Sequence, residues 1–451
     1  MEQLLAARAQ MGTSLAFHIA ITLFGVGLPF FLCITEGLAL KTKNPTWLLL
    51  TRRWAKATAI LFAIGAVSGT IISFELGLLW PTYTKFAGEV VGLPFMLEGF
   101  AFFLEAIFLG LYLYGWNRLS PLVHWLCSFP IWIGGLLSAW FIVSANSWMN
   151  TPAGFVIQQG YIVDINPWQA ILNPSMPYET THQLLACFVA TSFGIAAIYA
   201  VAFLRGKRDD YHRKALLLAM MVAIIATPLQ LLSGDLNARF LAQAQPVKFA
   251  AMEGDLYTEK GPPLRIGGLV DPKTGQVYYA IEIPYGESLL VYGNLTGEIR
   301  GLDAFALQDQ PDAVPVIHLA FDVMVGCGCF ALLITGLFWL LFWRRKRRIA
   351  DNPWLLRGIV VAGPCTVIAV ICGWMVTEMG RQPWVISGFL RTRDAVTPAP
   401  WVGVTFLVFV LIYLLLSSAL VWLLLGLLRQ PLPQAESIEE IYHEAEESVG
   451  V

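Results

Sequence analysis

Residues 355–384 read LLRGIVVAGPCTVIAVICGWMVTEMGRQPW, an apolar run that closes on an acid, a guanidinium and a second tryptophan. Residues 355–378 are long enough to cross the hydrocarbon core of a bilayer as a helix, which takes about 20 apolar residues. An acid such as Glu378 at the margin of that core is costly unless it faces a cavity, a partner or a metal. The stretch therefore predicts a transmembrane helix that brings a functional acid to one membrane surface.

The composition predicts the same class of protein for the whole chain. Of its 451 residues, 57% are hydrophobic and 13% are charged, with a mean hydropathy of +0.64. Soluble domains carry about 25% charged residues, and the net charge of -2 argues against a nucleic-acid partner. The seven cysteines lie in apolar runs without zinc or iron–sulfur spacing, so we interpret them as core residues. These features predict an all-α polytopic membrane protein.

Nine apolar stretches are predicted as transmembrane helices. They lie near residues 14–38, 55–79, 93–115, 122–146, 181–205, 214–233, 316–343, 355–378 and 401–428. Of the 29 Lys and Arg residues, 18 fall in five short segments on one side of this arrangement, whereas the link 147–180 has none. Because basic residues favour the cytoplasmic side, the N-terminus is predicted outside and the C-terminus inside. Residues 1–13 also lack the basic start of a signal peptide.

These stretches divide the chain into four parts. Residues 1–233 hold the first six transmembrane helices, 234–315 form a long external loop, 316–428 hold the last three helices, and 429–451 form an acidic cytoplasmic tail, expected to be a frayed helix. The external loop carries 11 acidic and 6 basic residues and a strand-like run at Gln276–Ile283. A loop of this length in a compact protein is usually functional or mobile, so we expect it to form part of a site.

Six chemically distinctive side chains fall in the outer half of the predicted membrane, on five helices. They are His18, Glu98, Glu105, His182, Met324 and Glu378. His and Met are common axial ligands of haem iron, and a His/Met pair suits a low-spin haem. Each residue also has a simpler interpretation, as a hydrogen-bonded or core residue, and Glu98 and Glu105 could form a proton relay without a metal. The remaining histidines, His124, His212, His318 and His443, are interpreted as structural or solvent-exposed.

Six short stretches make the sequence resemble subunit I of the cytochrome bd family of quinol oxidases over essentially its whole length. They are Arg8–Gln10 (RAQ), Leu97–Gly99 (LEG), Phe102–Glu105 (FFLE), Ser144–Met149 (SANSWM), Lys248–Glu253 (KFAAME) and Gly373–Trp384 (GWMVTEMGRQPW). The last of these is the most specific. Nine helices with the N-terminus outside also agree with the family.

The resemblance implies three haems and a residue set for them. His182 and Met324 correspond to the ligand pair of a low-spin haem b. His18, Glu98 and Glu378 correspond to residues that serve two high-spin haems, a haem b and a haem d. Trp374 corresponds to an aromatic side chain between haems, and Arg381 would lie beside Glu378, suited to a haem propionate or to the charge balance of the pair.

The resemblance also implies routes for protons and for quinol. Glu105, Ser138 and Asn146 correspond to polar groups proposed to carry protons to the oxygen site, and Lys248 and Glu253 to residues linked to quinol oxidation. The implied activity is oxidation of quinol at the outer face and reduction of O2 to water with cytoplasmic protons. The implied location is the bacterial plasma membrane, or a thylakoid membrane in a photosynthetic source. The implied partners are a second large membrane subunit and, as a further candidate, a small single-helix one.

Two alternatives stay open at this point. One is a bd-like, cyanide-insensitive oxidase with a further haem b in place of haem d. The other is a non-haem ion or proton transporter subunit, in which the intramembrane acids form an ion path. The sequence also departs from the family pattern. Asp322 stands where some members have an Arg that supports a haem propionate, so either another cation replaces it or that haem has a lower potential. The external loop is the short form.

Overall fold

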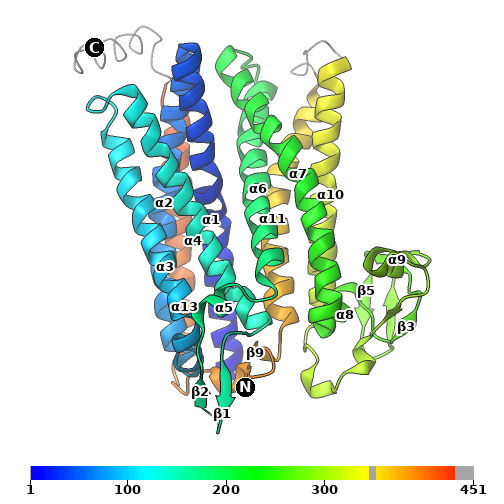
Figure 1. Ribbon diagram of the computed structural model, residues 1–451. Helices are drawn as coiled ribbons and strands as arrows, with labels where there is room; N and C mark the ends of the chain where they lie inside the picture. The colour runs from blue at the N-terminus through cyan, green and yellow to red at the C-terminus, as the bar shows by residue number, and fades with distance from the viewer. Residues whose placement is uncertain (1, 160, 345–351, 432–451) are drawn as a thin grey trace.

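The computed structural model describes residues 2–159, 161–344 and 352–431. Within these residues, nine helices are long and apolar enough to cross a membrane, which confirms the predicted fold class. They are α1 (Glu2–Thr42), α2 (Pro45–Leu79), α3 (Pro81–Tyr114), α4 (Pro121–Asn150), α6 (Met176–Leu204), α7 (Asp210–Ala244), α10 (Val314–Arg344), α11 (Pro353–Gly380) and α13 (Val402–Arg429). They run roughly parallel in a bundle, with the N-terminus at the same end as the predicted external loop (Figure 1).

The helices begin and end at local signals that an apolar window does not detect. Asn44, Asp209 and Asn352 accept hydrogen bonds from the first turns of α2, α7 and α11, and Pro45 and Pro353 occupy the first turn. Several helices therefore extend well beyond the predicted spans: α1 begins at Glu2, and α7 continues to Ala244. The hydrocarbon thickness sets only the apolar part of a helix, so its polar ends can continue into the interface.

The bundle consists of two groups of helices. Helices α1–α4 and α13 form one group, and α6, α7, α10 and α11 form the other (Figure 1). α1 contacts members of both groups, and Phe31, Phe193 and Phe338 are fully buried in the shared core. α13 is the least buried of the nine and presents apolar side chains outward. This is the expected arrangement for a helix on the lipid-facing side of a bundle.

The segment between α7 and α10 forms a small domain of short elements, named the external domain after its predicted location. These are α8 (Pro246–Glu253), β3 (Glu259–Lys260), β4 (Leu264–Ile266), β5 (Leu269–Asp271), β6 (Gln276–Tyr278), β7 (Ile281–Ile283), α9 (Gly286–Tyr292), β8 (Glu298–Ile299), η1 (Leu302–Ala304) and η2 (Leu307–Asp309). Three nested antiparallel pairs, β3–β8, β4–β7 and β5–β6, hold it together. The run predicted as one strand is instead two, β6 and β7. Tyr279 between them has a φ of 66°, and this break lets the two halves pair with different strands.

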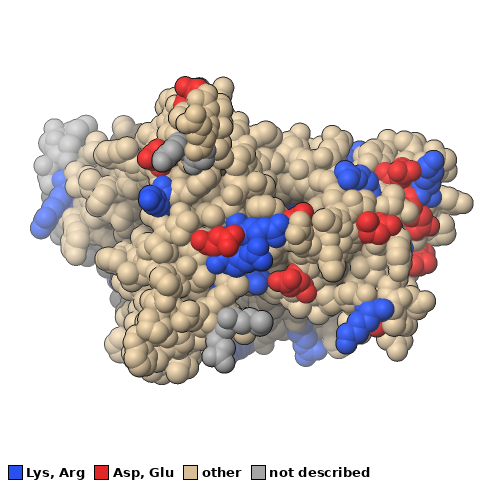
Figure 2. Space-filling model, turned by 90° about the horizontal axis from the view of Figure 1, so that it is seen from below, with Lys and Arg blue, Asp and Glu red and all other residues tan. Residues whose placement is uncertain are grey.

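Shorter elements complete the same end of the bundle. The link between α4 and α6 contains the hairpin β1 (Val156–Gln158) and β2 (Tyr161–Val163), then α5 (Pro167–Ile171); β9 (Trp384–Ile386), β10 (Leu390–Arg391) and α12 (Thr392–Ala395) follow α11. Seen from this end, charged side chains of both signs gather over the external domain at the right and in a patch near the middle, within a largely uncharged surface (Figure 2). The predicted helix of the acidic tail and His443 lie outside the described residues.

Candidate functional site

The imidazole of His182 is held by two side chains of α7. Its Nδ1 lies 3.0 Å from the hydroxyl of Ser233, and that hydroxyl donates to the carbonyl oxygen of Gln230 at 2.9 Å. Ser233 therefore accepts from Nδ1–H, which leaves the lone pair of the imidazole on Nε2. The amide of Gln230 lies 3.0 Å from this Nε2. His182 thus has the tautomer in which Nε2 can bind a metal.

Met324 lies in the same group of helices. A Cβ atom placed on Gly373 of α11 would lie 3.0 Å from the Met324 sulfur, and one on Gly234 of α7 would lie 3.2 Å from the His182 ring. The residue after Gly373, Trp374, donates from its indole to the side chain of Gln183 at 3.1 Å. Helices α6, α7, α10 and α11 therefore converge around the predicted pair, and glycines leave room beside both side chains.

His18 on α1 has surroundings of the same kind. Its Nδ1 lies 2.9 Å from the hydroxyl of Ser68 on α2, which donates to the carbonyl oxygen of Gly65 at 3.0 Å. A Cβ on Gly69 would lie 3.0 Å from the imidazole. The same reasoning gives His18 a free lone pair on Nε2.

Glu378 lies at the centre of a polar network at the C-terminal end of α11. Asn146 donates to one of its carboxylate oxygens at 2.5 Å, and Arg381 to the other at 2.6 Å. The side-chain oxygen of Asn150 accepts from Lys248 at 2.7 Å and from Arg381 at 3.5 Å. Lys248 and Arg381 are both only 4% exposed, and the Nε of Arg381 is buried without a hydrogen-bond partner among the described residues. The network joins the predicted quinol-side residue Lys248 to Glu378.

The two acids of α3 face α4. Ser138 donates to Glu98 at 3.0 Å. Glu105 is 6% exposed and packs against Gly134 and Gly135, where a Cβ on Gly134 would lie 2.9 Å from the Glu105 backbone nitrogen. Only glycine therefore permits this close approach of α3 and α4. Of the three residues predicted for the proton path, Ser138 contacts Glu98, whereas Asn146 contacts Glu378.

Lys248 and Glu253 lie at the two ends of the short helix α8, outside the transmembrane helices. Burial lowers the pKa of Lys248 to about 8, partly offset by the carboxylate of Glu179. Burial raises the pKa of Glu253 to about 8, and the nearby acids Asp255 and Asp322 add to the increase. Groups that titrate near neutral pH are suited to exchanging protons with a substrate.

Several residues of this region had no clear signal in the sequence. Asn150 follows directly after the SANSWM stretch and joins Lys248, Arg381 and Glu179, to which it donates at 3.0 Å. Glu179 lies in the first turn of α6 but two residues before the predicted helix 181–205, so the sequence did not mark it as a membrane acid. Ser68 and Ser233 did not stand out either, because serines are common in membrane helices.

The residues interpreted as structural make ordinary contacts. His124 lies 2.6 Å from Glu36, and His212 lies 2.8 Å from Asp209. His318 lies 2.8 Å from the carbonyl oxygen of Met252 and 3.3 Å from Asp322, whose other oxygen accepts from the backbone of Gly267 at 3.2 Å. Asp322 thus anchors the external domain to α10.

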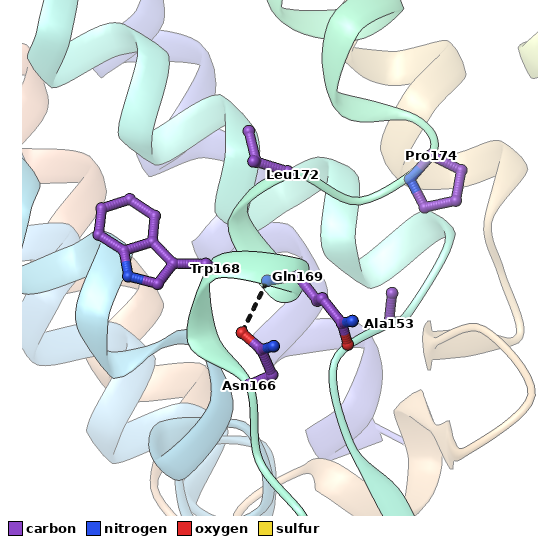
Figure 3. A pocket seen from close by; sticks show the side chains of 6 residues that line it. All are labelled: Ala153, Asn166, Trp168, Gln169, Leu172 and Pro174. Carbon is purple, nitrogen blue, oxygen red and sulfur yellow. Dashed lines mark hydrogen bonds between the residues drawn. The ribbon is translucent and has the colours of Figure 1, made fainter.

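A surface hollow of about 360 Å³ lies beside α5 at the same end of the bundle. It is lined by Ala153, Asn166, Trp168, Gln169, Leu172 and Pro174. Figure 3 shows the side chain of Asn166 capping α5 at the Gln169 backbone, with the side chains of Trp168 and Leu172 pointing in different directions from the same segment. The lining contains none of the predicted site residues, so the hollow is separate from the network around Glu378.

Comparisons with known proteins agree with this arrangement. The family model for cytochrome bd terminal oxidase subunit I matches residues 6–432. A Bacillus subtilis protein provisionally named cytochrome bd menaquinol oxidase subunit I is 37% identical, over 95% of this chain and 97% of its own length. Subunit 1 of a B. subtilis cytochrome bd ubiquinol oxidase is 30% identical, over 98% and 99%.

A more distant relative and a solved structure indicate the same family. Subunit 1 of the Escherichia coli cytochrome bd-II ubiquinol oxidase is 27% identical, over 86% of this chain and 88% of its own. A chain in the structure of bd oxidase from Geobacillus thermodenitrificans superposes with a TM-score of 0.90 at 37% identity, over 95% of this chain and 98% of that one. The chain belongs to the cytochrome bd terminal oxidase subunit I family.

Proposed function

We propose that this chain is the haem-carrying subunit of a respiratory quinol oxidase. The enzyme would oxidise quinol at the outer face of the plasma membrane and reduce O2 to water with cytoplasmic protons. Membership of the family supports the oxidase class over the ion-transporter alternative. The relatives named above are bacterial, which supports a location in the bacterial plasma membrane. The family description as a subunit I supports assembly with a second large membrane subunit; a small single-helix subunit is a further candidate partner.

The observation that carries the proposal is the environment of His182 and Met324. A neutral imidazole with its lone pair on Nε2, where the Gln230 amide lies in the structure, and a thioether on a neighbouring helix form the donor set of a low-spin haem b. The glycines beside both residues and the buried, unpartnered Nε of Arg381 also fit a bound haem, because a propionate would satisfy this nitrogen.

The other haem-linked residues are assigned by the same criteria. His18, Glu98 and Glu378 would serve two high-spin haems, a haem b and either a haem d or a further haem b. Bound haem would supply electron transfer and the iron at which O2 is reduced. Trp374 would lie between haems, and Arg381 would balance the charge of Glu378 at 2.6 Å.

The remaining residues would handle quinol and protons. Lys248, fixed by Asn150, would orient the quinol head group, and Glu253 would accept a quinol proton. Glu105, buried between α3 and α4, would hold a proton on its way from the cytoplasm. Ser138 and Asn146 would hydrogen-bond the acids at the end of this route, Glu98 and Glu378.

The proposal is tested by removing each ligand of the low-spin haem. His182→Ala and Met324→Ala should each abolish the low-spin haem b band in a reduced-minus-oxidised spectrum, and quinol-driven O2 uptake with it. Met221→Ala is the matched control, because Met221 is 54% exposed on the outside of α7, and it should leave the spectrum unchanged. Persistence of the band in both ligand variants would contradict the assignment.

A further inference from the structure

A cluster of buried acids lies next to Glu253 in the external domain. Asp255 and Glu287 are 3% and 2% exposed. Their carboxyl groups interact with each other, and Asp255 Oδ2 and Glu287 Oε1 are buried without a hydrogen-bond donor among the described residues. Two neighbouring carboxylates in a buried site cannot both stay ionised, so the pair must share a proton.

The cations around this cluster are too few to neutralise it. The groups that face it are the acids Glu253, Asp255, Glu287 and Asp322, the base Arg265 and the imidazole of His318. Arg265 donates to Asp255 at 2.7 Å and lies 3.5 Å from Glu282, which is 55% exposed. One guanidinium can balance only one buried carboxylate, so the others are stable only when they hold protons.

The local backbone places this pair directly after the quinol-side acid. α8 ends at Glu253, and Gly254 follows in the left-handed conformation with a φ of 81°. A Cβ there would lie 3.1 Å from Val270 and 3.2 Å from His318, so the turn is tight. The turn keeps Asp255 directly at the end of α8. Glu287 approaches Asp255 from the first turn of α9. Arg265 contacts both Asp255 and Glu282, so the pair is one side chain away from an exposed carboxylate.

We propose that Asp255 and Glu287 form a proton-accepting pair that takes quinol protons from Glu253 and releases them to external water. This proposal rests on the proposed function. Each quinol loses two electrons and two protons: the electrons go to O2, a transfer that bound haem would supply, and each proton breaks from a quinol oxygen. Glu253 gives its own proton to the Asp255–Glu287 pair, and the quinol proton forms a new O–H bond on the carboxylate that is left. The pair then releases one proton to water beside Glu282, so that all three acids return to their starting protonation state. Asp255 and Glu287 act on quinol only through Glu253 and are therefore not catalytic residues themselves.

The test compares two electron donors in the purified complex. Quinol releases protons when it is oxidised, whereas tetramethyl-p-phenylenediamine gives up one electron and no proton. Glu287→Gln and Asp255→Asn should lower kcat with quinol by at least about 10-fold at unchanged KM. The same variants should keep O2 uptake with the phenylenediamine within about twofold of wild type. Glu287→Asp should restore part of the quinol rate, because it keeps a titratable group.

A matched control and a spectroscopic readout complete the design. Glu298→Gln alters a half-exposed acid of the same domain, paired with Lys260 at 3.8 Å, and should change neither rate. Infrared spectra of wild type at neutral pH should contain a protonated carboxyl band that Glu287→Gln removes. This readout needs no turnover, and Asp255→Asn provides a second variant if Glu287→Gln does not assemble.

The outcomes separate the two proposals. If the wild-type complex does not oxidise quinol, the proposed function fails. If wild type oxidises quinol but Glu287→Gln and Asp255→Asn oxidise it equally well, or no carboxyl band is lost, the proton-accepting pair is overturned and the oxidase assignment stands. An equal loss with both electron donors would also overturn the pair, because it would indicate a general structural defect.

Discussion

Ser68 and Ser233 show how single residues prepare the two imidazoles. Each serine accepts from the Nδ1–H of a histidine on the adjacent helix and donates to the carbonyl oxygen three residues earlier in its own helix. The backbone carbonyl uses the only proton of the hydroxyl, so the serine can only accept from the ring. His18 and His182 therefore both direct the Nε2 lone pair away from the serine, as a metal ligand requires.

The environment of Met324 leads to a prediction at Gly373. A Cβ on this residue would lie 3.0 Å from the Met324 sulfur, closer than ordinary packing allows. Gly373→Ala should displace the thioether and reduce the low-spin haem b band, although Ala favours a helix by up to about 1 kcal/mol over Gly. Gly326→Ala on α10 is the control, because its Cβ would have nothing within 4 Å. Equal spectra for the two variants would argue against Met324 as the ligand.

The site residues that could be predicted from sequence are those whose burial in an apolar helix costs free energy. A carboxylate such as Glu105 or Glu378 stands out in a membrane helix because its burial must be compensated. Asp255 and Glu287 did not stand out, because acids are ordinary in a loop with 11 of them. Their burial results from the fold of α8, α9 and the short strands, which local sequence does not encode.

Among the elements, α8 connects the bundle to the external domain. At its start, Lys248 packs its stem against Gly380 of α11 and donates to Asn150 of α4. At its end, Glu253 faces the acids of the external domain. Eight residues thus join the network of Glu378 to the proposed proton exit. A shift of this helix would change both ends together.

The raised pKa of Glu253 predicts how stability depends on pH. Its folded pKa of about 8 lies above the ordinary 4.5, so the folded state binds this proton more tightly than the unfolded state. The stabilisation is complete below about pH 4.5 and is lost as the pH rises through about 8. Between about pH 4.5 and about pH 8, the Tm of wild type should therefore fall by roughly 2 °C or more relative to the Tm of Glu253→Gln.

Thermal unfolding measured at about pH 5, 7 and 8.5 covers the range between the unfolded and folded pKa values of Glu253 and tests this prediction. Glu298→Gln is the control, because its carboxylate is half exposed, and its Tm difference from wild type should stay constant with pH. A constant difference for Glu253→Gln as well would show that Glu253 is not protonated at neutral pH in the folded protein. Lys248 contributes only above this range, since its lowered pKa adds stability from about pH 8 upward.

The existence of the long elements followed from the sequence, whereas their ends and the small strands did not. Nine apolar runs predict nine helices because the bilayer requires internally satisfied backbone hydrogen bonds. The cap at Asp209 and the extension of α7 to Ala244 depend on polar residues outside that window. The run Gln276–Ile283 alternates like one strand, but pairing with β5 and β4 divides it at Tyr279.

At the scale of the molecule, most of the candidate residues lie in one half of the bundle. His182, Met324 and Glu378 lie in the parts of α6, α10 and α11 nearest the external domain, His18 lies in the first half of α1, and Glu98 lies midway along α3. Protons taken from the opposite side must therefore cross a long distance within the protein. Under the proposed function, Glu105, buried between α3 and α4, would be the intermediate proton carrier.

The orientation of the bundle in the membrane decides on which side quinol protons are released. This orientation can be measured. The basic residues of the short links predict that the link between α6 and α7 is cytoplasmic and the external domain is outside. On intact cells, a membrane-impermeant maleimide should label Tyr279→Cys, a residue 89% exposed in that domain. It should label Lys207→Cys, in the exposed α6–α7 link, only after the membrane is opened. The parent protein corrects for native cysteines. The reverse pattern would place proton release from Glu253 in the cytoplasm, and quinol oxidation would then no longer build a proton gradient across the membrane.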